Sequence, residues 1–354
     1  IASLNTYFTT AGSITYQGAS NNTTSRTLTT AVSDGALSAS TTSTINFTAV
    51  NDAPTLTAVS TLTGATEDTA LTISYDTLAA AANEADVDGD TLSFRVEAVS
   101  TGTLEKGSGS SWTAVTAGTT LLGASETLRW TPAAHANGTL NAFTVKAWDG
   151  ALASASAVQV TITVAAVNDA PVAATSTLPT IAEDVADGSN PGTLVSALVT
   201  NFTDVDSGAV KGLAVTSVVT TNGTWYYSTN AGGAWTTLTG VSTSAARLLK
   251  GDDANYKVRF VPTADFNGTA TLTYQAWDQT SGTAGSTAAV TTNGGSTAYS
   301  SNTSTATITV TAVNDAPSFA LPAGTTGAAG ATWTARESIR QWTAITSSAD
   351  GTKL

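Results

Sequence analysis

The sequence contains no cysteine and a single histidine, His135. The lack of cysteine excludes a disulfide framework, a thiolate metal site and a cysteine nucleophile. Basic residues are also few: 13 Lys and Arg stand against 26 Asp and Glu, giving a formal charge of −13. Because phosphate recognition needs clustered cations, nucleic acid is not expected as a partner. No apolar run approaches the ~18 residues of a membrane-spanning helix, so no membrane span is expected in this segment.

Sequence signals of catalysis are missing as well. There is no G-x-S-x-G elbow, no P-loop and no H-E-x-x-H motif. His135 lies in a loop, and Asp265 takes its place in the corresponding later stretch, so the imidazole has no recurrent partner. We therefore expect His135 to be a surface residue. The sequence predicts a protein that is not an enzyme.

The composition favours β-structure. Apolar residues make up 41% of the chain and charged residues only 11%, and most of the remainder is Thr, Ser, Gly and Asn. Thr with Val and Ile favours strands, whereas Gly and Asn favour turns. No long stretch rich in Leu, Glu and Lys indicates a helix. The fold class predicted is all-β.

One six-residue motif, A-V-N-D-A-P, is spelled three times, at residues 49–54, 166–171 and 312–317. A short motif that recurs at domain-sized intervals is typical of a tandem array. Alternating apolar residues precede it, and its proline stops the strand because proline has no N–H to donate to a neighbouring strand. The motif therefore predicts a stiff, extended joint between modules.

The three joints divide the chain into four parts. We expect the C-terminal part of a repeat at 1–50, a complete repeat at 51–167, a second complete repeat at 168–313, and a joint with the start of a further domain at 314–354. The second repeat has extra residues rich in Gly, Ser and Thr near 279–304, where we predict a long exposed loop.

Both complete repeats carry the same landmarks in the same order: a Glu-Asp pair, a D-x-D cluster, an Arg followed by Pro, an Asn-Gly pair and a Trp-Asp pair. Strands at this spacing predict an antiparallel sandwich of roughly seven strands per module. Because aromatic residues dominate sandwich cores, Trp130, Trp148 and Trp277 are expected to pack inside.

These motifs resemble the bacterial cadherin-like, VCBS-type tandem repeats of giant surface proteins and adhesins. The resemblance covers residues 1 to about 317, and it implies Ig-like or cadherin-like β-sandwich modules arranged end to end, with calcium at the joints. The cadherin joint reads D-x-N-D-N-x-P, whereas each joint here has Ala in place of the first Asp and of the second Asn. One or two ions per joint are therefore expected rather than three.

The chemistry of the acidic residues also favours a cation. Two carboxylates ~4 Å apart repel by about 4 kcal/mol at an effective dielectric constant of about 20. Hard oxygen ligands without His or Cys select Ca²⁺. The alternative is that the acids cap turns and keep strand edges soluble. The predicted metal-ligating residues are Asn51, Asp52, Glu67, Asp68, Asp86, Asp88, Asp90, Asp149, Asn168, Asp169, Glu183, Asp184, Asp204, Asp206 and Asp278.

The D-x-D cluster of the first repeat also matches four ligand positions of an EF-hand loop. Thr91 stands where that loop needs Gly, and the residues that follow alternate as a strand. We interpret the match as coincidence.

The leading hypothesis is a non-enzymatic structural or adhesive segment of a large extracellular bacterial surface protein, forming a calcium-stiffened rod or fibre. Its partners would be neighbouring modules or other copies of the chain. One alternative is a self-assembling filament or sheath subunit, in which 1–50 and 318–354 add strands to neighbouring copies. Another is a carbohydrate-binding accessory module that binds surface glycans on Trp225, Tyr226, Tyr227 and Trp235.

The last part of the chain has its own pattern. Residues 342–345 and 347–354 resemble the start of a sialidase-like β-propeller repeat, which predicts a parent protein that continues further. The chain also starts with Ile1 rather than Met, so we expect that residue 1 is not the start of the gene product.

Overall fold

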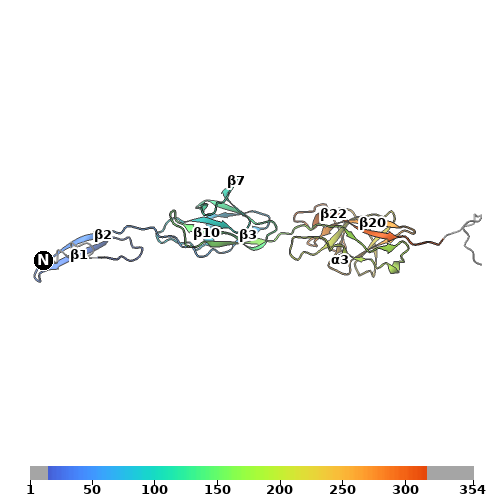
Figure 1. Cartoon of the computed structure of the whole chain (residues 1–354), viewed down its shortest axis with the longest axis horizontal. Helices are drawn as coiled ribbons and strands as arrows, with labels where there is room; N and C mark the ends of the chain where they lie inside the picture. Colours follow the sequence, from blue (N-terminus) through green and yellow to red (C-terminus); the bar gives the residue numbers. More distant parts are fainter. Residues whose placement is uncertain (1–14, 317–354) are drawn as a thin grey trace, which may run out of the picture. The chain divides into compact units, whose positions relative to one another are not determined.

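A computed structural model of the protein describes residues 15–316 (Figure 1). Over these residues the secondary structure is almost entirely β, which confirms the predicted fold class. The strands form a two-stranded hairpin followed by two β-sandwiches. The predicted propeller repeat in 342–354 lies outside the described residues.

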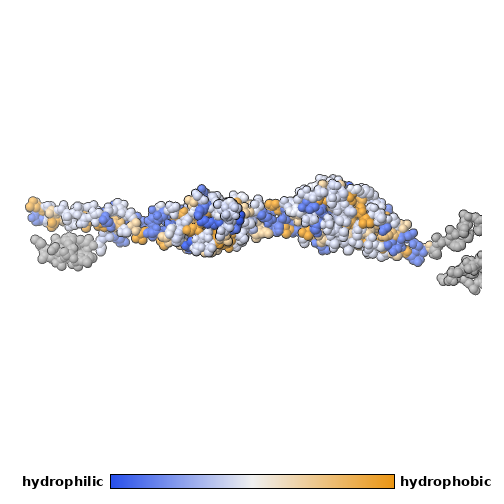
Figure 2. Space-filling model, turned by 90° about the horizontal axis from the view of Figure 1, so that it is seen from above, coloured by the Kyte–Doolittle hydropathy of each residue, from blue (hydrophilic) through white to orange (hydrophobic). Residues whose placement is uncertain are grey.

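The hairpin consists of β1 (Arg26–Ser33) and β2 (Ser38–Ile45), which pair antiparallel along their whole length. Its turn is closed by Asp34, whose Oδ1 accepts the N–H groups of Ala36 and Leu37. Nearly every hairpin side chain is exposed, and residues of intermediate polarity cover most of the hairpin face seen in Figure 2. The hairpin therefore has little core of its own.

The first sandwich contains two sheets. One has the order β3-β11-β10-β5-β8 and the other β4-β9-β6-β7. All pairs are antiparallel except β3 with β11. The strands are β3 (Leu62–Thr66), β4 (Leu71–Ser74), β5 (Ser93–Val99), β6 (Thr103–Ser108), β7 (Ser111–Ala114), β8 (Leu121–Leu122), β9 (Thr127–Thr131), β10 (Gly138–Trp148) and β11 (Val158–Ala165).

One short helix, α2 (Tyr75–Ala81), interrupts the β-structure of the first sandwich. Ser74 begins it, because the Ser74 side chain accepts a hydrogen bond from the Thr77 N–H group. Leu78 on its inner face is fully buried. The helix was not predicted, since seven residues of mixed propensity carry no helical periodicity that sequence alone reveals.

The second sandwich repeats the two-sheet plan. One sheet has the order β12-β22-β20-β15-β18-β21 with β13 also on β22, and the other has β14-β19-β16-β17. Two short helices accompany them, η1 (Asp187–Ser189) and α3 (Val195–Leu198). The strands are β12 (Ser176–Thr177), β13 (Ile181–Ala182), β14 (Thr193–Leu194), β15 (Gly212–Val218), β16 (Gly223–Ser228), β17 (Thr236–Thr237), β18 (Ala246–Lys250), β19 (Lys257–Pro262), β20 (Gly268–Trp277), β21 (Thr287–Ala288) and β22 (Tyr299–Thr311).

Two of the three tryptophan residues predicted to pack inside are buried. Trp130 is 0% exposed and Trp277 1% exposed. Trp148 differs, because it is only half-buried and the Arg95 guanidinium lies 4.9 Å from its ring centroid. An arginine therefore covers the face of Trp148 that the core does not.

The prediction of an exposed loop over 279–304 is wrong in part. Val290 and Ser300 in this stretch are 0% exposed, and the stretch contains β21 and the start of β22. Val290 and Tyr299 belong to a separate apolar cluster that contains Trp277. The reason is that the end of β20 is buried on both faces, and the inserted residues cover the face that the sandwich core leaves open.

Candidate metal sites at the acidic joints

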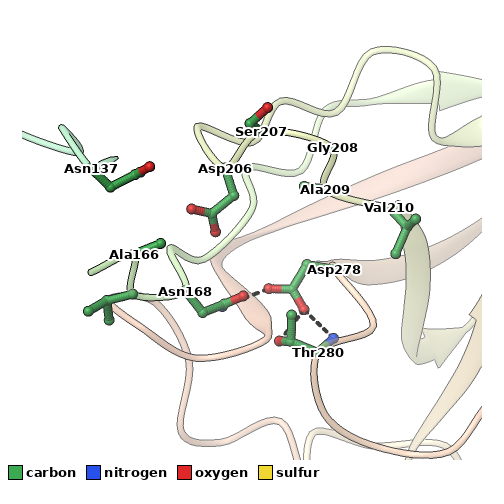
Figure 3. Close-up of a pocket in the computed structure, with 11 residues that line it drawn as sticks. Asn137, Ala166, Asn168, Asp206, Ser207, Gly208, Ala209, Val210, Asp278 and Thr280 are labelled. Atoms are coloured by element: carbon green, nitrogen blue, oxygen red, sulfur yellow. Dashed lines mark hydrogen bonds between the residues drawn. The ribbon is translucent and has the colours of Figure 1, made fainter. Parts of the chain in front are cut away.

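The joint at 166–171 is held on both sides by side chains from the two sandwiches. On the side of the first sandwich, Glu67 accepts a hydrogen bond from the Val167 N–H group. On the side of the second, Asp206 Oδ2 accepts the Asp169 N–H at 2.8 Å, and Asp278 Oδ2 accepts the Asn168 side-chain amide at 2.8 Å. Figure 3 shows Asp206, Asn168 and Asp278 facing one another here.

The joint at 49–54 has the same contacts with the module that follows it. Asp88 Oδ2 accepts the Asp52 N–H at 2.7 Å, and Asp149 Oδ2 accepts the Asn51 side-chain amide at 2.9 Å. In each repeat, therefore, the second Asp of the D-x-D cluster and the Asp of the Trp-Asp pair hold the joint. The structure brings these predicted residues together from positions about a hundred residues apart in the sequence.

The first Asp of each D-x-D cluster has one oxygen paired and one not. Asp86 Oδ1 accepts the N–H groups of Asp88 and Gly89 at 2.8 and 3.1 Å, and Asp204 Oδ1 accepts the Asp206 N–H at 2.9 Å. The other oxygen, Oδ2 of both Asp86 and Asp204, is buried and has no hydrogen-bond partner. Burial raises the pKa of Asp204, and the carboxylates of Asp206, Asp278 and Asp169 raise it further.

A buried carboxylate oxygen without a donor is costly unless a cation neutralises it. The same oxygen is left unpaired at the same place in both repeats. The neighbouring groups are other carboxylates, which surround Asp86 in the first repeat and Asp204 in the second. Carboxylate oxygens are ligands that Ca²⁺ prefers. These residues therefore fit a hard divalent cation.

Two groups of predicted residues bring three carboxylates close enough to share an ion. In one, oxygens of Glu67, Asp169 and Asp206 all lie within 4.8 Å of one another, and in the other those of Asp86, Asp88 and Asp90 do. Glu67 is only 2% exposed, and its second oxygen, Oε2, accepts the Asn137 side-chain amide at 3.1 Å.

The second repeat has the same Glu-Asn pair, since Asn267 donates to Glu183 Oε2 at 3.1 Å. Asp184, which follows Glu183, is exposed, as is Asp68. The recurrence shows that each Asn-Gly landmark places an amide against the Glu of the Glu-Asp pair.

A cavity of about 390 Å³ adjoins the joint at 166–171. Its lining includes the joint residues Ala166 and Asn168 together with Asn137, Asp206 and Asp278 (Figure 3). A smaller cavity of about 210 Å³ adjoins the joint at 49–54 and is lined in part by Asp52 and Asp88. Each cavity is lined by the second Asp of a D-x-D cluster, Asp206 at one joint and Asp88 at the other.

His135 is exposed, as the sequence predicted, but it is not without a partner. Its ring is 44% exposed, but Nδ1 lies 2.7 Å from Asp169 Oδ2 and 3.5 Å from Asp68 Oδ2. The hydrogen bond to Asp169 raises the pKa of the His135 imidazole, and the charges of Asp169, Asp68 and Glu67 act in the same direction. The partners are on two different repeats, which is why a search for a recurrent partner within one repeat missed them.

Burial contradicts the proposed sugar-binding platform. Trp225 is 0% and Tyr227 8% exposed. The remaining two aromatic rings, Tyr226 and Trp235, have the Arg259 guanidinium 5.2 and 4.4 Å from their centroids. Two of the four rings are thus buried and an arginine lies over one face of each of the other two, so the four do not form the open platform that was predicted.

Glu84 is a residue that the sequence analysis overlooked. Its Oε2 is buried without a hydrogen-bond partner, and burial raises the pKa of the carboxyl group. The available signal was its place two residues before Asp86, but a lone Glu with no counterpart in the second repeat gave no reason to single it out.

Replacing Glu84 with Gln is expected to stabilise the first sandwich in a pH-dependent way. Because the folded-state pKa lies above the unfolded one, the folded protein holds the proton more tightly. Stability therefore falls as the pH rises from the ordinary pKa of a glutamate, 4.5, through the folded-state pKa. Gln cannot ionise, so the free energy of unfolding of the variant should equal that of wild type below this pH range and exceed it above. Urea unfolding from pH 4 to 8 measures the difference, and parallel profiles for the two proteins would contradict the expectation.

The fold and the joints define a class of protein: Ig-like, cadherin-like β-sandwich repeats in tandem. Comparison with known families agrees, because residues 51–163 match the bacterial Ig domain family. No curated protein matches the chain. Among the described residues, no helix is long and apolar enough to cross a membrane.

Solved structures resemble the chain only distantly. An endo-fucoidan hydrolase of glycoside hydrolase family 107 shares 17% identity at a TM-score of 0.22, covering 83% of this chain and 35% of the hydrolase. The protocadherin γB4 extracellular domain shares 14% identity at a TM-score of 0.40, covering 81% and 39%. The D00–D0 domain of intimin shares 13% identity at a TM-score of 0.23, and the match covers 64% of this chain and 94% of the intimin domain. The chain thus spans little more than a third of the first two, and similarity at this level indicates no common function.

Proposed function

We propose that this chain is a structural or adhesive segment of an extracellular bacterial surface protein, in which calcium at the joints stiffens a row of sandwich modules. The observation that carries the proposal is the unpaired, buried Oδ2 of Asp86 and of Asp204, repeated at equivalent places beside two joints. The match of residues 51–163 to bacterial Ig domains supports the bacterial and extracellular setting.

The ligands would come from the predicted set. At the joint at 166–171, Glu67 belongs to the preceding sandwich, Asp169 to the joint and Asp206 to the following sandwich, so an ion bound by all three would tie three parts of the chain together. Beside the joint at 49–54, the three oxygens would come from Asp86, Asp88 and Asp90, which all belong to one loop of the following sandwich. Bound calcium supplies positive charge that cancels carboxylate repulsion, and it involves no chemical step.

The role of the modules would be mechanical. Each sandwich buries a core of its own, so repeating the unit lengthens a surface structure without new folding requirements. The partners in this role are neighbouring modules of the parent protein and other copies of the chain, and the segment needs no catalytic residue.

A second candidate is a filament or sheath subunit that adds strands between copies. The hairpin favours it, because β1 and β2 each pair with only one neighbour over the described residues and each leaves one edge open. Size-exclusion chromatography with light scattering separates the two candidates. A filament built by strand addition predicts particles that grow with protein concentration, whereas a rod segment predicts a monomer.

Thermal unfolding in calcium and in EDTA tests the leading proposal. Sites of the extracellular type bind Ca²⁺ at about 10⁻⁴–10⁻³ M, and saturation to 100 times the dissociation constant adds about 2.7 kcal/mol. We expect millimolar Ca²⁺ to raise the melting temperature by several degrees, Mg²⁺ to raise it less, and small-angle scattering to show a narrower distribution of lengths. Identical melting curves in Ca²⁺ and EDTA would overturn the calcium-dependent role.

A further inference from the structure

A second group of ligand atoms lies beside the carboxylates of the joint at 166–171. It consists of His135 Nδ1 with one oxygen each from Asp68 and Asp169, all within 4.8 Å of one another. Asp169 also belongs to the all-oxygen group with Glu67 and Asp206. Two adjoining clusters therefore share one carboxylate, but they differ in the type of donor atom.

The backbone holds the imidazole in place. His135 has φ of 56°, in the left-handed region, and its N–H group donates to Asp68 Oδ1 at 3.0 Å. The other oxygen of Asp68, Oδ2, faces the ring. One carboxylate thus fixes the loop with one oxygen and presents the other to Nδ1.

The fold does not require histidine at this position. Asp265 occupies the corresponding place in the second repeat with nearly the same backbone conformation, φ of 59°. Asp adopts the left-handed region readily, so it satisfies the loop as well as His does. What His135 adds to the first repeat is a nitrogen donor, the only imidazole in a chain that also lacks cysteine.

Nitrogen changes the metal preference of such a cluster. Calcium takes oxygen ligands almost exclusively, whereas imidazole together with carboxylates suits zinc and other divalent transition metals. We infer that Asp68, His135 and Asp169 form a separate site for a divalent transition-metal ion of the zinc class, with His135 Nδ1 as the nitrogen ligand. Three protein ligands leave at least one coordination position open for water or for a donor from a partner molecule.

Such an ion would sit next to the oxygen cluster that we assign to calcium, so the two sites would compete for Asp169 or share it. The inference does not depend on calcium binding, because the nitrogen donor distinguishes the site. It adds a second ion class to one joint and predicts that the two described joints differ in metal response.

Cobalt(II) serves as a spectroscopic probe of the site. The protein is prepared without a histidine tag, so that His135 is the only imidazole present. We expect Co²⁺ to produce a visible absorption band more intense than that of the hydrated ion, and Zn²⁺ to displace it stoichiometrically. Ca²⁺ at the same concentration should leave the band or weaken it only through Asp169.

The matched variant is His135→Asp, which places in the first repeat the residue that the second repeat already carries. It keeps the left-handed backbone and removes the nitrogen, so we expect the Zn²⁺ affinity to fall by about tenfold or more while Ca²⁺ binding is kept. Asp68→Asn is the second variant, since its side-chain oxygen still accepts the His135 N–H group. It should also weaken Zn²⁺ binding.

A cobalt band and a Zn²⁺ affinity that are the same in wild type and His135→Asp would overturn the inference, as would an NMR spectrum in which the His135 ring is unaffected by excess Zn²⁺. Either result would mean that His135 and Asp169 form an ion pair only. If the cobalt band depends on His135 while Ca²⁺ leaves the stability unchanged, the transition-metal site is upheld and the calcium-dependent role is overturned. Failure of the metal site and failure of the calcium role can therefore be told apart.

Discussion

Replacing Asp86 with Asn is expected to stabilise the first sandwich in EDTA and to destabilise it in calcium. Asn keeps the side-chain oxygen that accepts the Asp88 and Gly89 N–H groups, so the turn survives. The variant loses the charge on the buried, unpaired Oδ2 of Asp86, which without metal only opposes folding. With metal, the same change removes a ligand.

The expected change in the free energy of unfolding has opposite signs in EDTA and in calcium. Removing one buried, unsatisfied polar charge should raise the free energy of unfolding by about 1 kcal/mol in EDTA. In saturating calcium the variant should lose most of the increment of about 2.7 kcal/mol that binding at 100 times the dissociation constant gives. Urea unfolding monitored by tryptophan fluorescence, with and without Ca²⁺, measures both terms. Asp204→Asn tests the equivalent position in the second sandwich.

Asp253→Asn provides a matched control for this swap. Asp253 Oδ1 also accepts a nearby backbone N–H, that of Asn255, but Asp253 belongs to none of the carboxylate groups close enough to share an ion. Its substitution should change stability equally in calcium and in EDTA. If Asp86→Asn behaves like this control, the acidic clusters cap turns and hold no ion.

The sequence was sufficient to predict the all-β fold and the recurrence of joints with acids around them, because both depend on local patterns. Strand alternation follows from a period of two, and the turn at Asp86 follows from an Asp that caps its own loop. What local patterns could not give was the pairing of Asn51 with Asp149 or of Asn168 with Asp278, since these contacts form only after the strands between them are placed.

The errors have the same physical origin. The expectation that His135 has no partner considered only residues of its own repeat, whereas its partner Asp169 belongs to the joint that follows. The exposed loop over 279–304 was predicted from composition alone. Val290 is nevertheless buried, because it packs with Trp277 at the end of β20. Both outcomes depend on tertiary contacts that composition does not encode. The metal-ligating roles of the acids remain predictions.

Trp130→Ala is expected to lower the stability of the first sandwich by about 3–5 kcal/mol and to leave the second sandwich unchanged. Trp130 is fully buried among the residues of one core, and its Nε1 donates to the Thr101 carbonyl at 2.8 Å. Truncation to Ala therefore leaves both a large cavity and an unpaired carbonyl oxygen. Trp225→Ala should have the reciprocal effect, because Trp225 is fully buried in the other core.

Differential scanning calorimetry in EDTA checks this expectation. Two transitions should be resolved, and each tryptophan variant should shift only one of them. Trp112→Ala serves as the control. Trp112 is only half-buried and lies outside the core, with the Arg129 guanidinium 4.5 Å from its ring centroid, so its loss should lower stability by much less. If either core variant shifted every transition together, the sandwiches would not be independent units and the modular boundaries at 51–167 and 168–313 would be wrong.

Calcium should change this independence in a defined direction. An ion held by Glu67, Asp169 and Asp206 joins residues of both sandwiches, so unfolding either one releases it. In saturating calcium, Trp130→Ala should therefore lower the transition temperature of the second sandwich as well as that of the first. Adding Asp206→Asn should restore the independence of the two transitions that is expected in EDTA. A segment that bears load needs this coupling, because an ion bound within a single sandwich would stabilise that sandwich without resisting motion at the joint.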